Sequence, residues 1–264
     1  MVILARMVKG SSLLFGLFFL ASCANKVRVH TPAPLFMTAE ATGKSLGGEF
    51  LFSVMGGTEG SIDLDSDDLD GPLALRNDVA PMNMHLGLGI VEKVDFYLRS
   101  SLAESPGALG LKWQLLGKTK QEAKKGDHAL AIFLGGGSAQ SSRESDDIFD
   151  GDSDSDFEAE ADQTLREIGV IYSYRTGETS VTYSSFRVGT HDLEVDITKD
   201  NSTPSLEGET YEAKTTFVNA SIGIKRYWKS KTASLELAAQ NTNWSNNDST
   251  TFAFISGALG WYWD

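Results

Sequence analysis

The sequence predicts an all-β protein: an antiparallel up-and-down transmembrane β-barrel of about ten strands with long acidic outer loops. Three observations lead to this prediction. Segments of about nine or more residues alternate apolar and polar side chains through most of the chain after residue 46. Charges of both signs fall on the polar face of these segments, and aromatic residues gather at one end. Strands that face lipid on one side and a polar lumen on the other have this composition.

The stretch MHLGLGIVEKVDFYLRSSL, residues 84–102, is the clearest example. Leu86 and Leu88 share one face of an extended chain, and Phe96 and Leu98 continue that face after a two-residue turn. This pattern predicts a β-hairpin with one apolar and one polar wall. A soluble β-sandwich shows the same alternation. Repetition of the pattern at membrane-spanning length in several further segments favours the barrel.

Ten segments are predicted as strands: 47–60, 81–91, 93–102, 107–117, 128–139, 165–176, 177–189, 213–228, 230–242 and 250–263. Mostly short connections alternate with mostly long ones. The long ones carry two acidic runs, at 63–70 and 144–162. An even number of strands leaves both ends of the barrel on one side of the membrane, and short turns are typical of the periplasmic side.

Charged residues on the predicted inner face are candidates for the functional interior. They are Asp95, Arg99, Lys112, Glu167, Arg175, Lys225 and Glu236. Unpaired charges are costly away from bulk water, and a barrel this narrow is readily filled by side chains. We therefore expect a filled lumen, with a narrow ion-conducting pore as the alternative.

Aromatic residues at the periplasmic ends of the predicted strands form a candidate interfacial girdle. They are Trp113, Tyr172, Tyr174, Trp228, Trp261 and Trp263.

The N-terminus predicts export. Arg6 and Lys9 precede a short apolar run, as in a signal peptide, which we assign to residues 1–22; the true start could be Met7. The tetrapeptide LASC resembles a bacterial lipobox, which implies that Cys23, the only cysteine, is lipidated and becomes the mature N-terminus. Residues 23–46 lack a sustained period and predict a lipid-anchored tether, followed by a barrel over 47–264.

The chain over about residues 45–264 resembles the small outer-membrane β-barrels of Gram-negative bacteria. Its C-terminal SGALGWYWD, with Trp261 and Trp263, resembles the terminal strand that the barrel-assembly machinery recognises. The resemblance implies an outer-membrane location with a periplasmic N-terminus, and membrane lipid and the assembly machinery as partners. A formal net charge of -13 argues against a nucleic-acid partner.

Residues 144–162 hold ten carboxylates. The EF-hand spacing fails, because Phe157 replaces the required glycine in the best register. A solvated acidic loop is expected, with weak calcium or magnesium binding as the alternative. The candidate ligands are Asp150, Asp152, Asp154 and Asp156. We expect no other cofactor besides the covalent lipid.

The expected role is structural, surface-interacting or that of a narrow pore, without catalytic activity. One alternative is a periplasmic lipoprotein with a soluble β-sandwich or barrel that binds a small ligand. Another is a hydrolase at the outer rim, because omptin proteases are also ten-stranded and use a His–Asp pair there. His191 and Asp192 lie in a predicted outer loop, but adjacent residues of an extended chain point in opposite directions, so His191 would need another partner.

Overall fold

The computed structural model describes residues 26–30, 35–63, 74–101, 106–145, 157–200, 207–244 and 249–263. Its regular structure is β-strand. Within these ranges, no helix has the length and apolar character needed to cross a membrane.

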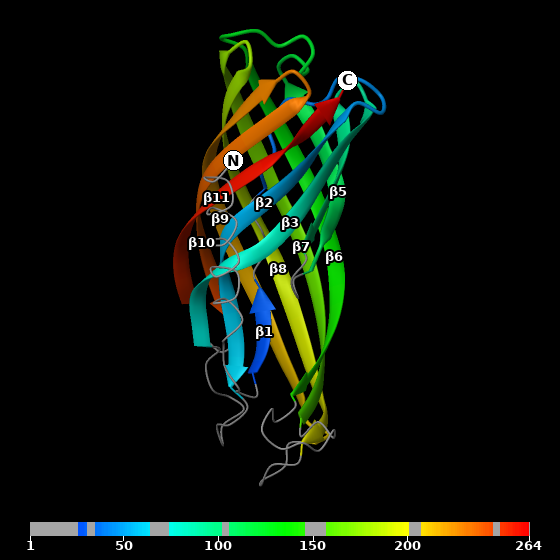
Figure 1. Ribbon diagram of the computed structural model, residues 1–264, viewed down its shortest axis with the longest axis vertical. Helices are drawn as coiled ribbons and strands as arrows, with labels where there is room; N and C mark the ends of the chain where they lie inside the picture. The colour runs from blue at the N-terminus through cyan, green and yellow to red at the C-terminus, as the bar shows by residue number, and fades with distance from the viewer. Residues whose placement is uncertain are drawn as a thin grey trace, which may run out of the picture.

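Eleven strands make up the sheet (Figure 1). They are β1 Lys26–His30, β2 Gly48–Asp63, β3 Ala74–Val91, β4 Val94–Ser101, β5 Ala108–Leu116, β6 His128–Ser145, β7 Phe157–Gly177, β8 Ser180–Asp200, β9 Thr210–Trp228, β10 Lys231–Trp244 and β11 Ser249–Trp263.

Strands β2 to β11 form a closed ten-stranded antiparallel barrel, which confirms the predicted fold class. Each strand pairs with its neighbours in sequence, and β11 pairs back with β2 from Gly48↔Trp263 to Met55↔Ser256. We call this β2–β11 pairing the seam. A closed sheet leaves no edge with unpaired backbone groups, which is the condition for crossing a membrane with strands.

The two ends of the barrel differ in their connections. At the turn end lie the connections 92–93, 117–127, 178–179 and 229–230, together with Gly48 and Trp263. In Figure 1 this end is at the top, beside the C-terminus. At the loop end lie the connections that follow β2, β4, β6, β8 and β10. Short periplasmic turns opposite longer outer loops are typical of outer-membrane barrels.

Near the turn end, the outward side chains are apolar and exposed. They include Val54, Leu98, Leu109, Leu111, Ile132, Leu134, Ile168, Val170, Phe186, Val188, Val218, Ile222, Ile224, Leu235, Leu237, Ile255 and Leu259. Inward residues of the same strands are polar and buried: Lys112 is 7% exposed, whereas its neighbour Leu111 is 43% exposed. A soluble β-sandwich buries its apolar face. The reverse arrangement identifies this part of the barrel as the lipid-facing zone.

Toward the loop end, the same strands reverse this polarity. In β8, Phe186 and Val188 point outward, but beyond them the outward side is acidic and Leu193 and Val195 are buried inside. In β7, Ala159 and Ala161 are buried, whereas Glu160 is exposed. An apolar interior with a polar exterior is the pattern of a sheet in water. The long strands therefore extend past the lipid-facing zone.

This reversal explains why the sequence-based strand ends are too short. The segment 177–189 was expected as a strand and 190–200 as outer loop, but β8 continues to Asp200. Likewise, residues 157–162 of the expected acidic loop belong to β7. The alternation continues through both segments, but with apolar and polar faces exchanged, so it no longer matches the lipid-facing pattern.

Strand β1 lies at the loop end, in the lower half of Figure 1. It pairs with the last residues of β2, from Lys26↔Asp63 to His30↔Glu59. It therefore lies at the end of the barrel opposite Gly48, where β2 begins.

The boundary of the lipid-facing zone can be tested on a single strand. Ile222 and Thr216 are exposed outward residues of β9, with Ile222 in the apolar zone and Thr216 in the polar one. Ile222→Arg should destabilise the barrel folded in lipid vesicles by about 2–4 kcal/mol, because it places a cation in the bilayer. Thr216→Arg should change the stability by less than about 1 kcal/mol. Urea titration of both variants measures the difference; equal losses would contradict the proposed boundary.

Candidate functional site

The interior of the barrel near the turn end is the candidate site. The seven charged residues predicted to face the lumen all lie there, each at most 7% exposed. The structure adds Arg187 and Glu49, which the sequence analysis did not single out. These nine charges come from seven strands, β2, β4, β5, β7, β8, β9 and β10.

The lumen also contains a segment of the chain itself. Residues 35–42, which we call the plug, are buried inside the barrel. Residues 23–46 were expected to form a tether between the lipid and the barrel, but residues 35–42 lie inside the barrel. The physical reason is that the plug satisfies buried polar groups of the wall, an interaction that no local pattern in 23–46 reveals.

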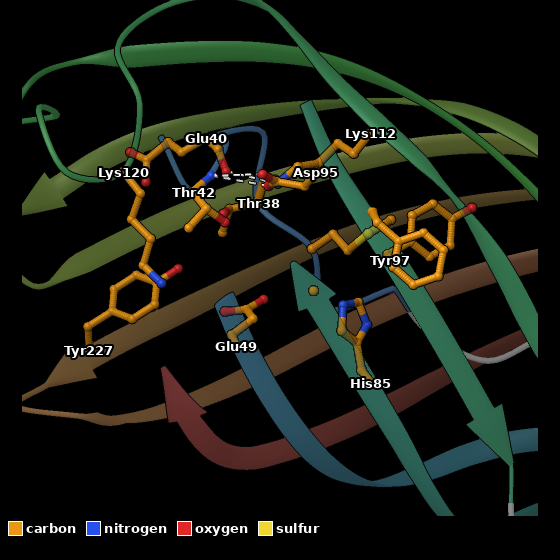
Figure 2. Close-up of a pocket in the computed structure, with 13 residues that line it drawn as sticks. Thr38, Glu40, Thr42, Glu49, His85, Asp95, Tyr97, Lys112, Lys120 and Tyr227 are labelled. Carbon is orange, nitrogen blue, oxygen red and sulfur yellow. Dashed lines mark hydrogen bonds and ion pairs between the residues drawn. The ribbon is translucent and has the colours of Figure 1, made fainter. Parts of the chain in front are cut away.

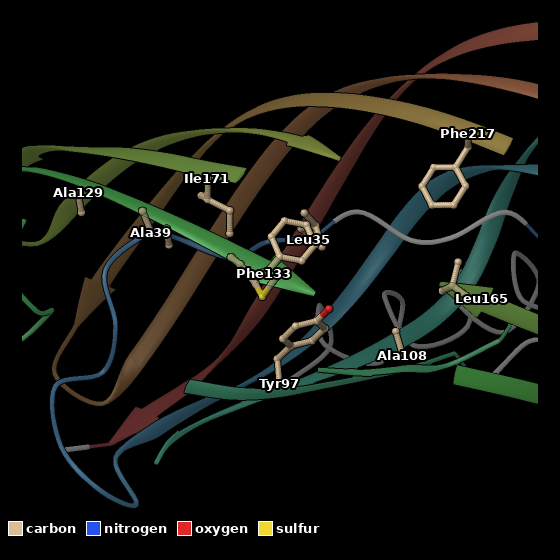
Figure 3. Packing of buried hydrophobic residues seen from close by; sticks show 11 residues of the cluster. Leu35, Ala39, Tyr97, Ala108, Ala129, Phe133, Leu165, Ile171 and Phe217 are labelled. Carbon is tan, nitrogen blue, oxygen red and sulfur yellow. The ribbon is translucent and has the colours of Figure 1, made fainter. Parts of the chain in front are cut away.

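The plug packs its side chains against opposite parts of the wall. Leu35, Met37 and Ala39 belong to one buried cluster, in which Figure 3 shows Leu35 beside Phe133 and Tyr97. Phe36 points elsewhere and packs with Leu51 and Ala258. Because both sides of the plug are covered, it fills the cross-section rather than lining one wall.

Wall side chains hydrogen-bond to the backbone of the plug at its inner end. The amide groups of Leu35 and Phe36 donate to the carboxylate of Glu236, at 3.3 and 2.9 Å. Lys225 donates to the carbonyl oxygen of Phe36 at 2.6 Å and also pairs with Glu49 at 2.7 Å. Phe36 has a φ of 48°, a conformation costly for a residue with a side chain. Charged partners on both sides hold it there.

The middle of the plug is held by Lys112 and Asp95. The Nζ of Lys112 donates to the carbonyl oxygens of Thr38 and Glu40, at 3.0 and 2.8 Å, and pairs with Asp95 at 3.0 Å. Asp95 accepts from the amide of Thr42 at 3.1 Å (Figure 2). One buried ion pair thus binds three backbone groups of the plug.

Two neutral wall residues complete this recognition. Ser173 accepts from the amide of Ala39 at 2.8 Å, and Gln114 accepts from the amide of Ala41 at 2.7 Å. Buried backbone groups are costly when unpaired, so these contacts are needed to keep the plug inside.

Glu40 makes the only side-chain ion pair between the plug and the wall within the described residues. Its carboxylate binds Arg175 through two bonds, 2.6 Å to Nε and 2.7 Å to Nη2. Both side chains are at most 4% exposed. A bidentate arginine–carboxylate pair is geometrically specific, so this contact fixes the position of the plug along the barrel.

The connection 117–127 covers the turn end of the lumen. The amide of Lys120 donates to the carbonyl oxygen of Ala41 at 2.8 Å. Its ammonium group lies over the rings of Tyr227 and Tyr262, at 4.3 and 4.4 Å. At the end of this connection, the backbone amide of Lys124 and then the side chain of Lys118 lower the pKa of Asp127 by hydrogen bonding.

A second charged layer lies beyond the plug. Glu167 is bound by Arg99 and, at 2.9 Å, by Arg187. The hydroxyl group of Tyr97 donates to the same carboxylate at 3.1 Å. Arg187 also lies 5.4 Å from the ring centre of Phe217. These groups cross-link β4, β7, β8 and β9 inside the barrel.

A cavity beside the plug is small. It has a volume of about 20 Å³. Its lining residues, shown in Figure 2, include Glu49, His85 and Asp95. A cavity of this volume holds about one water molecule. It offers no room for a larger solute.

The predicted aromatic girdle lies on the outside. Its six members are each at least 37% exposed: Trp113, Tyr172, Tyr174, Trp228, Trp261 and Trp263. They sit at the turn-end parts of their strands. Trp263 also donates from its ring to the carbonyl oxygen of Leu46 at 2.8 Å, so it joins the segment between the plug and β2 to the last strand.

Other predicted site residues lie elsewhere. Cys23 and the candidate ligands Asp150, Asp152, Asp154 and Asp156 are outside the described residues. In the ranges that are described, no three His, Cys, Asp or Glu side chains are grouped to hold a metal ion.

His191 and Asp192 lie within β8 rather than in a loop. His191 is 1% exposed inside the barrel, where its Nε2 lies 3.1 Å from Gln163. Asp192, one residue on, falls on the opposite face of the strand.

Comparison with known proteins gives a likeness in fold. No family model matches the chain, and no curated protein matches it in sequence. Among solved structures, the outer membrane protease OmpT from Escherichia coli is similar, with a TM-score of 0.42 and 11% identity over 83% of this chain and 94% of that one. This neighbour is named as a protease, whereas the chain was expected to have no catalytic activity. That expectation is withdrawn.

The bidentate pair between plug and wall predicts a large loss of stability. Glu40→Ala leaves Arg175 buried without its carboxylate and should destabilise the barrel by about 3–5 kcal/mol. Glu160→Ala, at an exposed position of β7, is the control and should cost less than about 1 kcal/mol. Both values can be measured by urea titration in vesicles. If the two variants are equally stable, Glu40 is not bound inside the folded barrel.

Proposed function

We propose that the protein is a lipid-anchored outer-membrane β-barrel that its own N-terminal segment keeps closed. In this role the barrel is a membrane-embedded support that presents its loop end for interactions at the cell surface.

The observation that carries this proposal is the occupied lumen. Five of the seven predicted lumen charges contact the plug directly: Asp95, Lys112, Arg175, Lys225 and Glu236. A cavity beside them has a volume of about 20 Å³. An ion-conducting pore requires a continuous water-filled path, and the plug together with the Glu167 layer interrupts it.

The connections support an orientation with the turn end in the periplasm. Long acidic segments follow the strands at the loop end, whereas Lys118, Lys120, Lys124 and Lys125 lie in a connection at the turn end. Long loops belong to the outer side in such barrels. We propose that the acidic loop between β6 and β7 is solvated there and binds calcium or magnesium weakly, with millimolar affinity.

Anchoring and assembly follow from the chain ends. The LASC sequence supports lipidation of Cys23 and removal of residues 1–22. The exposed aromatic residues Trp261 and Trp263 on the last strand support recognition by the barrel-assembly machinery. Lipid is the partner of the apolar outer zone.

Conductance in planar lipid bilayers tests the closed state. Wild-type protein should show no channel steps. Glu40→Arg should show them, because a cation facing Arg175 expels the plug from the lumen. Glu160→Arg makes the same change at an exposed position and should remain silent. Steady conductance of the wild type would favour the narrow-pore role instead.

Metabolic labelling with a radioactive fatty acid tests the anchor. The wild type should incorporate label, and Cys23→Ser should lose it and accumulate unprocessed chain. Ser22→Ala is the neighbouring control and should remain labelled. Equal labelling of Cys23→Ser and wild type would show that the lipid is not on this cysteine.

A further inference from the structure

We propose that the N-terminal segment passes through the whole barrel, entering at the loop end and leaving at the turn end. The lipid on Cys23 would then insert into the leaflet at the loop end, which is the outer leaflet of the outer membrane. The placement of the lipid rests on the proposed lipidation of Cys23, whereas the path of the chain rests only on contacts of the described residues.

The path begins at the turn end, where the segment joins β2. The amide of Leu46 donates to the carbonyl oxygen of Gly89 at 2.9 Å, two residues before the end of β3. Thr42 binds Asp95, the second residue of β4. Both partners adjoin the turn at 92–93, so residues 42–46 occupy the turn end.

Lower residue numbers lie deeper in the barrel. Glu40 binds Arg175 and Ala39 binds Ser173, respectively two and four residues before the end of β7. The chain therefore advances away from the turn end as it is followed toward the N-terminus.

The next contacts continue in the same direction. The amides of Phe36 and Leu35 bind Glu236, the sixth residue of β10 counted from the turn end. Leu35 packs in the same cluster as Leu165 and Phe217, which lie farther from that end than Glu236 does by strand position. The carbonyl oxygen of Phe36 also accepts from Lys225, the fourth residue of β9 counted from the turn end.

Strand β1 completes the path at the loop end. It pairs with residues 59–63 of β2, the part of that strand most distant from Gly48. Its register puts Lys26 opposite Asp63, the last residue of β2. Basic residues alternate along β1, and β2 ends on an acidic residue, so the charges of the two segments are complementary.

Chain length then limits where the lipid can be. Cys23 precedes Lys26 by three residues, which span at most about 11 Å when fully extended. The hydrocarbon core of a bilayer is about 30 Å thick. A lipid on Cys23 cannot reach the leaflet at the turn end while β1 is paired at the loop end. The lipid surface at the loop end is therefore its partner.

Disulfide formation in the oxidising cell envelope tests the path directly. Arg28→Cys combined with Ser61→Cys should form a disulfide, because these positions are partners in the β1–β2 register. Arg28→Cys with Leu51→Cys is the control, since Leu51 faces the lumen near the turn end of the same strand. A faster-migrating band on a non-reducing gel is expected for the first pair alone. Absence of that band, or its appearance in the control pair, would refute the threaded path.

Labelling of intact cells with a membrane-impermeant maleimide tests the side of the membrane. Lys26→Cys should react on intact cells together with Thr198→Cys, an exposed position near the loop end of β8. Lys124→Cys, exposed at the turn end, should react only after the outer membrane is opened. Reaction of Lys26→Cys together with Lys124→Cys instead would overturn the inference. A sealed and acylated barrel with that result would refute the threading while leaving the proposed function intact.

Discussion

Wall side chains bind the backbone of residues 35–42 inside the barrel, and among the described side chains the ion-paired charges of the lumen balance only with this segment in place. The wall contributes five buried cations, Arg99, Lys112, Arg175, Arg187 and Lys225, and four carboxylates, Glu49, Asp95, Glu167 and Glu236. Glu40 of the plug supplies the fifth carboxylate. Removing one partner of a buried ion pair is strongly destabilising. The plug is therefore part of the folded interior, and the closed lumen follows from its presence.

The same physical rule, that polar groups seek polar surroundings, acts differently in the two zones of the barrel. In the lipid-facing zone it places charges inside and apolar residues such as Ile222 outside. Beyond that zone, water lies outside, and residues such as Leu193 and Val195 turn inward. The point of reversal on each long strand marks where the surrounding medium changes. In a single strand such as β8, the position where the apolar side chains change from the outer to the inner face therefore indicates the boundary of the membrane.

The sequence alone predicted the features that depend only on the alternation of apolar and polar side chains along a strand. All ten barrel strands, the facing of Leu111 and Lys112, and the even strand count follow from alternation between neighbouring residues. It did not predict the plug, because the partners of Leu35 and Phe36 lie 201 and 200 residues away. One signal was present: in LFMTAEAT, Leu35, Met37, Ala39 and Ala41 alternate with larger or polar residues. Strand β8 was predicted too short because its alternation reverses instead of ending.

The seam between β2 and β11 has eight residue pairs, from Gly48↔Trp263 to Met55↔Ser256, whereas its neighbour β10–β11 has thirteen. Plug contacts lie on both sides of this seam, since Lys225 of β9 binds Phe36 together with Glu49 of β2. Opening the seam would therefore also break bonds to the plug, so the two events are cooperative. A contact that stabilises the native state but forms late slows unfolding more than it speeds folding. The plug thus slows the opening of the joint between the first and last strands of the barrel and lengthens the lifetime of the closed state.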